Sequence, residues 1–220
     1  FGFTNHSWNF DGDEIFAQYS LSGNLSFVNY WWAWWRLEYN PSTLDDRLTR
    51  GGPLTSTPVQ RRASLQFETD TRRHNTFSGD LSFANSTAGG WETSYEASFN
   101  LRPTSSLQLR FGPELERGHG LAQFVDAVAD TLADATFGAR YVFSTLDQTT
   151  LSFTTRLDWT FSPRLSLQLF VQPLVASGNY SEYKELQAPR RFRFDVYGRD
   201  RGTIEPGDPG QLRIDPDGGG

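Results

Sequence analysis

The sequence predicts an all-β protein, an antiparallel transmembrane β-barrel of about eleven strands, and three observations favour this fold. Long stretches alternate apolar and polar residues, and successive side chains of a strand point to opposite faces. Many alternating arms reach ten residues or so, which suits a tilted strand crossing a bilayer (~9–11 residues) better than a soluble strand (~5–6). The chain also carries 18 Phe, 8 Tyr and 7 Trp, an aromatic content typical of the girdles at membrane interfaces.

The clearest element is the stretch Gln148–Pro173. Its first arm places apolar residues on one parity from Leu151 to Phe161 and polar residues on the other. After a turn at Ser162–Arg164, the second arm repeats the scheme, with Phe170 as its exception. This pattern predicts a transmembrane β-hairpin with one lipid-facing surface.

The N-terminal part predicts strands of uneven clarity. Phe1–Gly12 indicates a weak strand, and Asp13–Gly23 a better one that ends in a tight turn at Ser22–Asn24. Asn24–Tyr39 is the most aromatic segment of the chain. Proline, glycine and aspartate then break the pattern over Asn40–Pro58, which predicts a long loop.

The middle of the chain predicts a series of hairpins. Its alternating segments are Arg62–Thr69, Phe77–Phe83, Trp91–Arg102 and Leu107–Phe111, separated by turns at Asp70–Asn75, Asn85–Gly90 and Pro103. Short turns at one side and a long loop at the other are typical of outer-membrane barrels.

The segment Leu121–Asp130 is compatible with two structures. Asp126, Asp130 and Asp134 recur every four residues, which would form one polar face of an amphipathic helix. The alternative is a weak strand, and an internal similarity favours it.

That similarity relates Phe99–Pro113 to Trp159–Pro173 in the order and spacing of residues. Two hairpins built alike are expected to turn at the same side of the membrane. This requires two strands between them, at about Leu121–Asp130 and Thr136–Thr145, so we predict strand for the ambiguous segment.

The alternation fades after Val175, which divides the chain into barrel strands over residues 1–180 and a loop-rich segment or interrupted final strands over residues 181–220. Within the second part, Arg190–Val196 predicts one short strand. An odd strand count with no obvious closing strand leads us to expect an incomplete barrel, with more strands before Phe1 or after Gly220.

Three motifs carry a resemblance to a known family. The stretches are DDRLTRGGP (Asp45–Pro53), RYVFSTLDQTTLSFTTRLDWTFSPRLSLQLFVQP (Arg140–Pro173) and PRRFRFDVYG (Pro189–Gly198). They resemble bacterial proteins of unknown function in which a domain similar to family-nine carbohydrate-binding modules precedes a C-terminal outer-membrane barrel. The resemblance implies that this chain corresponds to the barrel, in the bacterial outer membrane. It assigns no catalytic or binding residue.

Seven charged residues fall on the polar parity of the predicted strands and are candidates for a charged lumen. Such residues tune permeation in selective pores. The alternative is a satisfied charge network that fills a narrow lumen. The candidates are Glu92, Glu96, Arg102, Arg110, Arg140, Arg156 and Asp158.

Aromatic residues near strand ends predict the interfacial girdle. The cluster of four tryptophans between Trp31 and Trp35 has a second interpretation, a platform on which sugar rings stack. We favour the girdle, whose candidate members are Trp31, Trp35, Tyr39, Trp91, Tyr141, Trp159 and Phe161.

Other classes of function find little support in the sequence. Without cysteine, and with His6, His74 and His119 scattered, neither a metal site nor another cofactor is predicted. No nucleophile motif is present, so we do not expect an enzyme. The formal net charge of −6 argues against nucleic acid as a partner.

The expected role is therefore a pore, transport-related or scaffold barrel in contact with membrane lipid. The alternatives are a subunit of a larger envelope assembly, in contact with other envelope proteins, and a soluble β-sheet protein that binds glycans.

Overall fold

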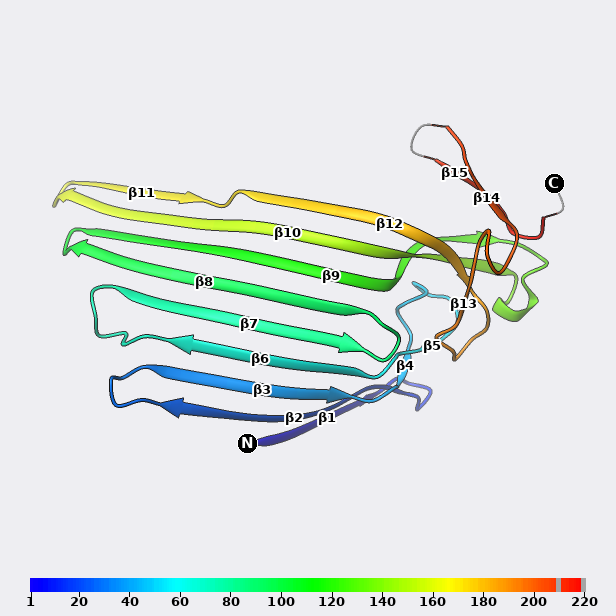
Figure 1. Ribbon diagram of the computed structural model, residues 1–220, viewed down its shortest axis with the longest axis horizontal. Helices are drawn as coiled ribbons and strands as arrows, with labels where there is room; N and C mark the ends of the chain where they lie inside the picture. Colours follow the sequence, from blue (N-terminus) through cyan, green and yellow to red (C-terminus); the bar gives the residue numbers. More distant parts are fainter. Residues whose placement is uncertain (209–210, 219–220) are drawn as a thin grey trace.

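The computed structural model describes residues 1–208 and 211–218. One large antiparallel sheet dominates, with the strand order β1-β2-β3-β6-β7-β8-β9-β10-β12-β13 and β11 paired to β10 (Figure 1). Its strands are β1 (Gly2–Trp8), β2 (Glu14–Ser26), β3 (Trp32–Asn40), β6 (Gln60–Glu68), β7 (Thr76–Ser86), β8 (Trp91–Thr104), β9 (Leu107–Ala129), β10 (Ala139–Ser162), β11 (Leu165–Val171), β12 (Leu174–Leu186) and β13 (Phe194–Val196). Two small hairpins, β4 (Leu44–Asp45) with β5 (Thr55–Ser56) and β14 (Thr203–Pro206) with β15 (Leu212–Asp215), complete the strands.

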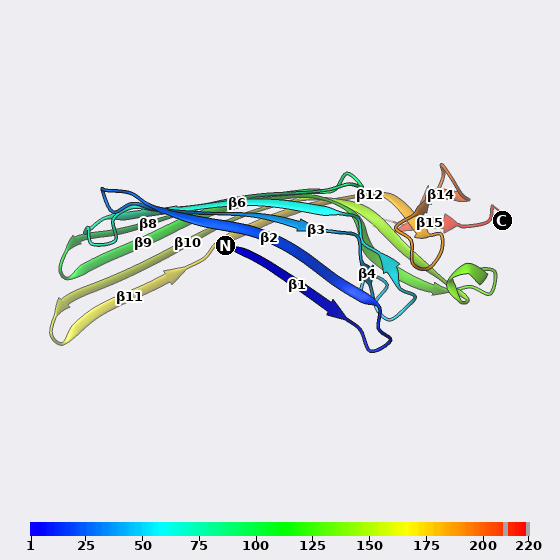
Figure 2. The ribbon, with the colours of Figure 1, turned by 90° about the horizontal axis from the view of Figure 1, so that it is seen from below.

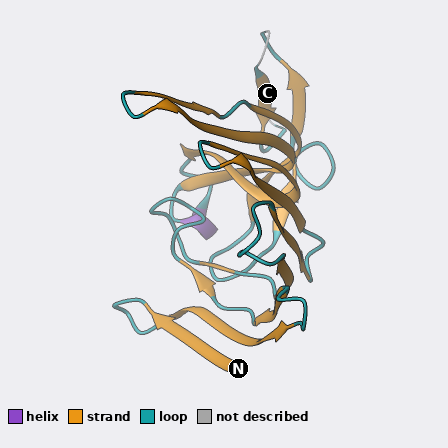
Figure 3. Cartoon of the chain, turned by 90° about the vertical axis from the view of Figure 1, so that its left-hand side faces the viewer, coloured by secondary structure: helices purple, strands orange, loops and turns teal. Residues whose placement is uncertain are grey.

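The sheet is an open arc. Viewed along its strands, the sheet curves around one side (Figure 3). In the side view, the loop that carries β4 lies on the concave side (Figure 2). The all-β class and the large antiparallel sheet of 11 strands are confirmed. The sheet is not closed, because within the described residues β1 has a single neighbour and the β11–β12 edge is covered only by the short β13.

Leu121–Asp130 lies almost wholly in β9, so the strand prediction is confirmed and the helix alternative is wrong. The structure joins this segment to Leu107–Phe111 in one strand of 23 residues. The facing strand, β10, is likewise continuous over 24 residues. The turns after β8 and β10 lie at the same end of the sheet, as the internal similarity predicts (Figure 1). The two separate strands predicted between the hairpins are wrong, because Leu121–Asp130 continues β9 and most of Thr136–Thr145 belongs to β10.

The predicted turn at Ser22–Asn24 is wrong. β2 runs straight through Gly23 to Ser26, and the hairpin turns instead between Phe27 and Trp31, whose backbone N–H and C=O are 2.8 Å apart. The indole of Trp35 on the neighbouring strand packs directly against Gly23, and a Cβ added at Gly23 would lie only 2.9 Å from the ring. The glycine allows close packing across two strands and does not mark a turn.

The predicted loop Asn40–Pro58 is largely irregular apart from the β4–β5 hairpin. Asp45 Oδ1 organises it by accepting hydrogen bonds from the backbone N–H groups of Arg47 and Leu48, at 2.7 and 3.0 Å. Gly52 packs against the ring of Tyr141, which occupies the space that a side chain would need. The loop is thus fixed to one end of the sheet.

The core lies at that same end, where the C-terminal segment packs on β10 and β12. Phe143 is fully buried between the rings of Phe124 and Phe194, at centroid distances of 5.8 and 5.2 Å. Val196 of β13 pairs with Lys184 of β12. The predicted short strand at Arg190–Val196 corresponds to β13.

We predict that Phe143→Ala lowers the free energy of unfolding by about 3–5 kcal/mol, because a large ring is removed from a closed core. Phe137 is the matched control, since its ring is 79% exposed. Denaturant titration of both variants checks the difference. Equal losses for Phe143→Ala and Phe137→Ala would show that this core does not stabilise the fold.

Candidate functional surfaces

The central strands expose their apolar parity more than their polar parity. On β6 and β7, Leu65, Leu81 and Phe83 are 43%, 41% and 48% exposed. The neighbouring polar residues, such as Gln66 and Ser82, are less exposed and are half-buried. A soluble sheet with one solvated face shows the reverse, apolar side chains inward and polar side chains outward.

The apolar side chains form continuous rows across the sheet, because residues directly opposite each other in a ladder share a face. One row crosses seven strands through aligned partners in every pair. It contains Trp35, Leu65, Leu81, Tyr95, Leu115, Leu151 and Val175. We call the convex surface built from such rows the apolar band.

Aromatic residues lie at both limits of the apolar band. At one limit, Tyr19 and Tyr39 are aligned across β2 and β3 with ring centroids 6.5 Å apart, and Trp91 belongs to the same row. At the other, Trp159 and Phe161 have centroids 4.3 Å apart. The twelve residues of β10 between these rows span about 40 Å along the strand. With the ~35–45° tilt of membrane barrels, the band would be about 30 Å tall.

The remaining girdle candidates lie elsewhere. Trp31 follows the β2–β3 turn, at the same end as Trp159, whereas Trp35 lies in the middle of the apolar band. Tyr141 is far from both limits and packs on Gly52. Six of the seven candidates therefore belong to the apolar band or its ends.

The polar parity forms the concave face, where Glu92 and Glu96 lie four residues apart on β8, with Ser94 between them. Arg62 Nη2 is 3.4 Å from Glu92 Oε2, which joins β6 to β8 across β7. Glu96 lies directly between Asp80 and Glu114 on the neighbouring strands. Acidic side chains therefore dominate the middle of this face.

Four other charged candidates lie on the concave face nearer the β10–β11 turn. Arg110 and Arg156 are directly opposite each other on β9 and β10, and the guanidinium of Arg156 is 5.6 Å from the ring centroid of Phe170. Arg102 and Asp158 line a hollow beside the β8–β9 turn. This end of the concave face is accordingly richer in positive charge.

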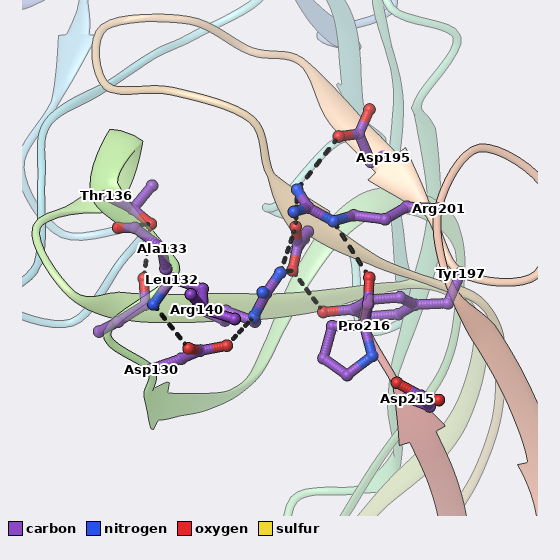
Figure 4. Close-up of polar contacts among 12 residues, drawn as sticks. Asp130, Leu132, Ala133, Thr136, Arg140, Asp195, Tyr197, Arg201, Asp215 and Pro216 are labelled. Carbon is purple, nitrogen blue, oxygen red and sulfur yellow. Dashed lines mark hydrogen bonds and ion pairs between the residues drawn. The ribbon is translucent and has the colours of Figure 1, made fainter. Parts of the chain in front are cut away.

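Arg140 lies in a different environment, a buried ion cluster on the part of β10 that extends beyond the apolar band (Figure 4). Its Nε is 2.5 Å from Asp130 Oδ2, and its Nη1 is 3.0 and 2.9 Å from the two oxygens of Glu185. Arg201 Nη1 approaches Glu185 Oε1 to 2.6 Å, and the Tyr197 hydroxyl donates to Glu185 Oε2 at 2.8 Å.

The ionisation of this cluster follows from its contacts. Burial alone would lower the pKa of Arg140, but hydrogen bonds to Asp130 and Glu185 outweigh it and raise the pKa above its usual value. The hydrogen bond from Arg140 lowers the pKa of Asp130. Burial, helped by the bond to Glu185, raises the pKa of Tyr197. The cluster therefore remains an ion network with a neutral phenol.

A groove of about 490 Å³ opens on the concave face between the sheet and the Asn40–Pro58 loop. Its walls include Arg62 and Glu92 from the sheet, Thr57 from the loop and Phe192 from the C-terminal segment. Gly118 and Gly120 of β9 form part of its floor. It combines residues from the sheet, the loop and the C-terminal segment.

Sequence reasoning missed both the ion cluster and the groove. Glu185 and Arg201 lie in the C-terminal part, where no periodicity indicates which side chains turn inward. The pair His119–Asp147, whose Nδ1 and Oδ1 are 2.7 Å apart, was equally hidden, because the residues are brought together by the β9–β10 register. In the described part of the chain, no group of three or more His, Asp or Glu side chains is arranged to hold a metal ion.

None of the helices among the described residues is long and apolar enough to cross a membrane. Comparisons with protein-family models, with curated proteins and with solved structures find no match. The function is therefore argued from the geometry of these surfaces.

We predict that Arg140→Ala lowers the free energy of unfolding by about 3–5 kcal/mol, because it removes the buried cation that pairs with both the buried Glu185 and the half-buried Asp130. Arg199 is the matched control, an arginine that pairs with Glu182 and Asp200 at the surface. Its replacement by alanine should have a far smaller effect, since exposed ion pairs contribute little. Thermal unfolding of both variants at neutral pH measures the contrast, and similar shifts would contradict the assignment.

Proposed function

We propose that this chain is part of the wall of a bacterial outer-membrane β-barrel. Its apolar band would face lipid and its concave face would line the lumen. The observation that carries the proposal is the inverted exposure of the sheet, in which large apolar side chains are the exposed parity on strand after strand. Lipid chains are the surroundings that make such a surface stable, and polar residues inside are typical of membrane barrels.

The height of the apolar band supports the same placement. A band of about 30 Å between two aromatic limits agrees with the thickness of a bilayer's hydrocarbon core, ~30 Å. The resemblance of Arg140–Pro173 to outer-membrane barrel proteins points in the same direction. β9 and β10 extend well beyond the band, and their extensions carry the ion cluster, so we place this end outside the hydrocarbon region.

Within the barrel, the concave face supports a role in solute passage or as a scaffold for another domain. Its charges are neither uniformly paired nor buried, and acidic residues in the middle give way to Arg102, Arg110 and Arg156 near one end. A lumen lined in this way would discriminate between ions if water filled it.

Adjacent residues on opposite faces of β7 test the membrane placement. We predict that Leu81→Arg destabilises the inserted protein by about 2–4 kcal/mol, because it places a charge against lipid. Ser82→Arg, on the concave face, should have little effect. The measurement is the fraction of detergent-extracted protein that runs as a compact band on a cold denaturing gel and shifts on boiling.

A chain that stays soluble without detergent and shows no shift on boiling would overturn the membrane placement. It would favour a soluble sheet that binds glycans. Equal tolerance of arginine at Leu81 and Ser82 would also contradict the assignment of the two faces.

Bilayer conductance separates a pore from a scaffold. In a conducting barrel, we expect Arg156→Ala to shift the reversal potential toward cation selectivity, because one positive charge leaves the lumen. Leu157→Ala, the next residue on the lipid-facing parity, is the control and should leave selectivity unchanged. An electrically silent barrel would assign the chain to the scaffold role.

The open edges favour a second candidate role, a subunit of a larger envelope assembly. From β1 to β12 the chain passes through eight antiparallel pairings, β1-β2, β2-β3, β3-β6, β6-β7, β7-β8, β8-β9, β9-β10 and β10-β12. Because eight is even, the two edge strands run in the same direction. Closure by antiparallel pairs alone would need an odd number of further strands, and exposed edges of this kind are templates for pairing.

A further inference from the structure

We propose that the groove on the concave face is a binding site for a short neutral oligosaccharide. The groove is formed wholly by described residues of this chain, so the proposal does not depend on the membrane placement. Its volume of about 490 Å³ falls within the range of small-molecule sites, ~300–1,000 Å³.

Small residues make the floor. Gly118 lies directly between Glu92 and Gln148 on the neighbouring strands, and Gly120 shares its face because side chains alternate along β9. Neither glycine has a positive φ. A Cβ added at either position would meet its nearest atom at 3.7 or 3.9 Å, an ordinary contact. The backbone does not require glycine here, and the missing side chains leave the floor open.

The walls offer both donors and acceptors, as sugar hydroxyls require. Gln60 and Glu116 line the groove, and their side chains have no hydrogen-bond partner in the described chain. Gln148 is engaged only by a 3.3 Å bond to Thr150. A hydroxyl group both donates and accepts, so a polyhydroxylated ligand can satisfy amides and carboxylates together.

Charge balance favours a neutral ligand. The positive charge of Arg62 is offset by Glu92 at 3.4 Å and by Glu38 at 3.9 Å. Among the described residues that line the groove, the two arginines, Arg62 and Arg117, are offset by Asp45, Glu92 and Glu116, so the lining has no excess of positive charge that would select phosphate or sulfate. The half-buried ring of Phe192 gives an aromatic surface at the loop side, on which a sugar ring can stack.

The test is calorimetric titration of the detergent-purified protein with maltotriose and with triacetylchitotriose. Sialyllactose and the trimer of glucosamine serve as anionic and cationic probes. We expect at least one neutral trisaccharide to bind, and Gly118→Leu to weaken that binding at least about tenfold, because the new side chain fills the floor. Gly2→Leu, at a strand glycine with open space around it, should bind like the unaltered protein.

Failure of both neutral trisaccharides to bind the unaltered protein would overturn the proposal. Full binding by Gly118→Leu, or tighter binding of either charged probe, would do the same. If Gly118→Leu does not fold, Gln60→Ala and Glu116→Gln supply the test through the lost hydrogen bonds. The gel shift on boiling reports the barrel separately, so the two proposals can fail independently.

Discussion

The rest of the structure depends on an apolar surface that no described residue of the chain covers. In a soluble sheet, apolar side chains cover a core and polar side chains face water. Here Leu65, Leu81 and Tyr95 stand on the convex face with nothing of the described chain above them. Each large apolar side chain contributes about 1.5–3 kcal/mol when it leaves water, so the rows together demand an apolar environment. Under the proposed membrane placement, a lipid bilayer would supply that environment along a band of this height.

At the end of the sheet near β13, apolar side chains are buried in a closed core, in contrast to the exposed side chains of the apolar band. There β9, β10 and β12 extend beyond the neighbouring strands. Three parts of the chain that are far apart in sequence come together at this end: the β1–β2 turn, the Asn40–Pro58 loop and the C-terminal segment. Arg190 of the C-terminal segment contacts both other parts. Its guanidinium makes two hydrogen bonds to Asp13, at 3.0 and 3.1 Å, and its backbone N–H donates to the carbonyl of Leu54. The Arg140 cluster then fixes the C-terminal segment to β10. Polar contacts and the small core around Phe143 together organise this end.

The sequence predicts the strands well where apolar and polar residues alternate without interruption. Alternation over Leu151–Phe161 and over Arg62–Thr69 identifies β10 and β6, since a strand with one apolar and one polar face must alternate. Glycine and proline mislead at four positions. Gly23 accommodates Trp35 inside a strand, and Gly112 and Pro113 lie within β9 although such residues usually end strands. The turn predicted at Pro103 is wrong as well, because β8 continues through Pro103 to Thr104. In each case a contact or register across strands decides the outcome, and a local pattern cannot show it.

The candidate surfaces divide in the same way. Parity alone places Glu92, Glu96, Arg110 and Arg156 on one face, because period two is a property of the strand itself. It could not separate Arg140 from them. Beyond the band the register shifts between Ser144 and Leu146, and β10 enters the packed end of the molecule. Partners such as Glu185 come from 45 residues further along the chain, a pairing that only the tertiary fold determines.

The groove lies where the apolar band ends and the packed end of the sheet begins. Its floor row, Glu92–Gly118–Gln148, is adjacent to the row of Trp91, His119 and Asp147 that limits the apolar band. Seen from the concave side, the groove thus lies at the depth of one aromatic limit, and not in the middle of the sheet. If the band faces lipid, a ligand in the groove sits at the mouth of the lumen, where the Asn40–Pro58 loop covers it. A site in this position would concentrate a solute before it reaches the acidic middle and the arginines beyond.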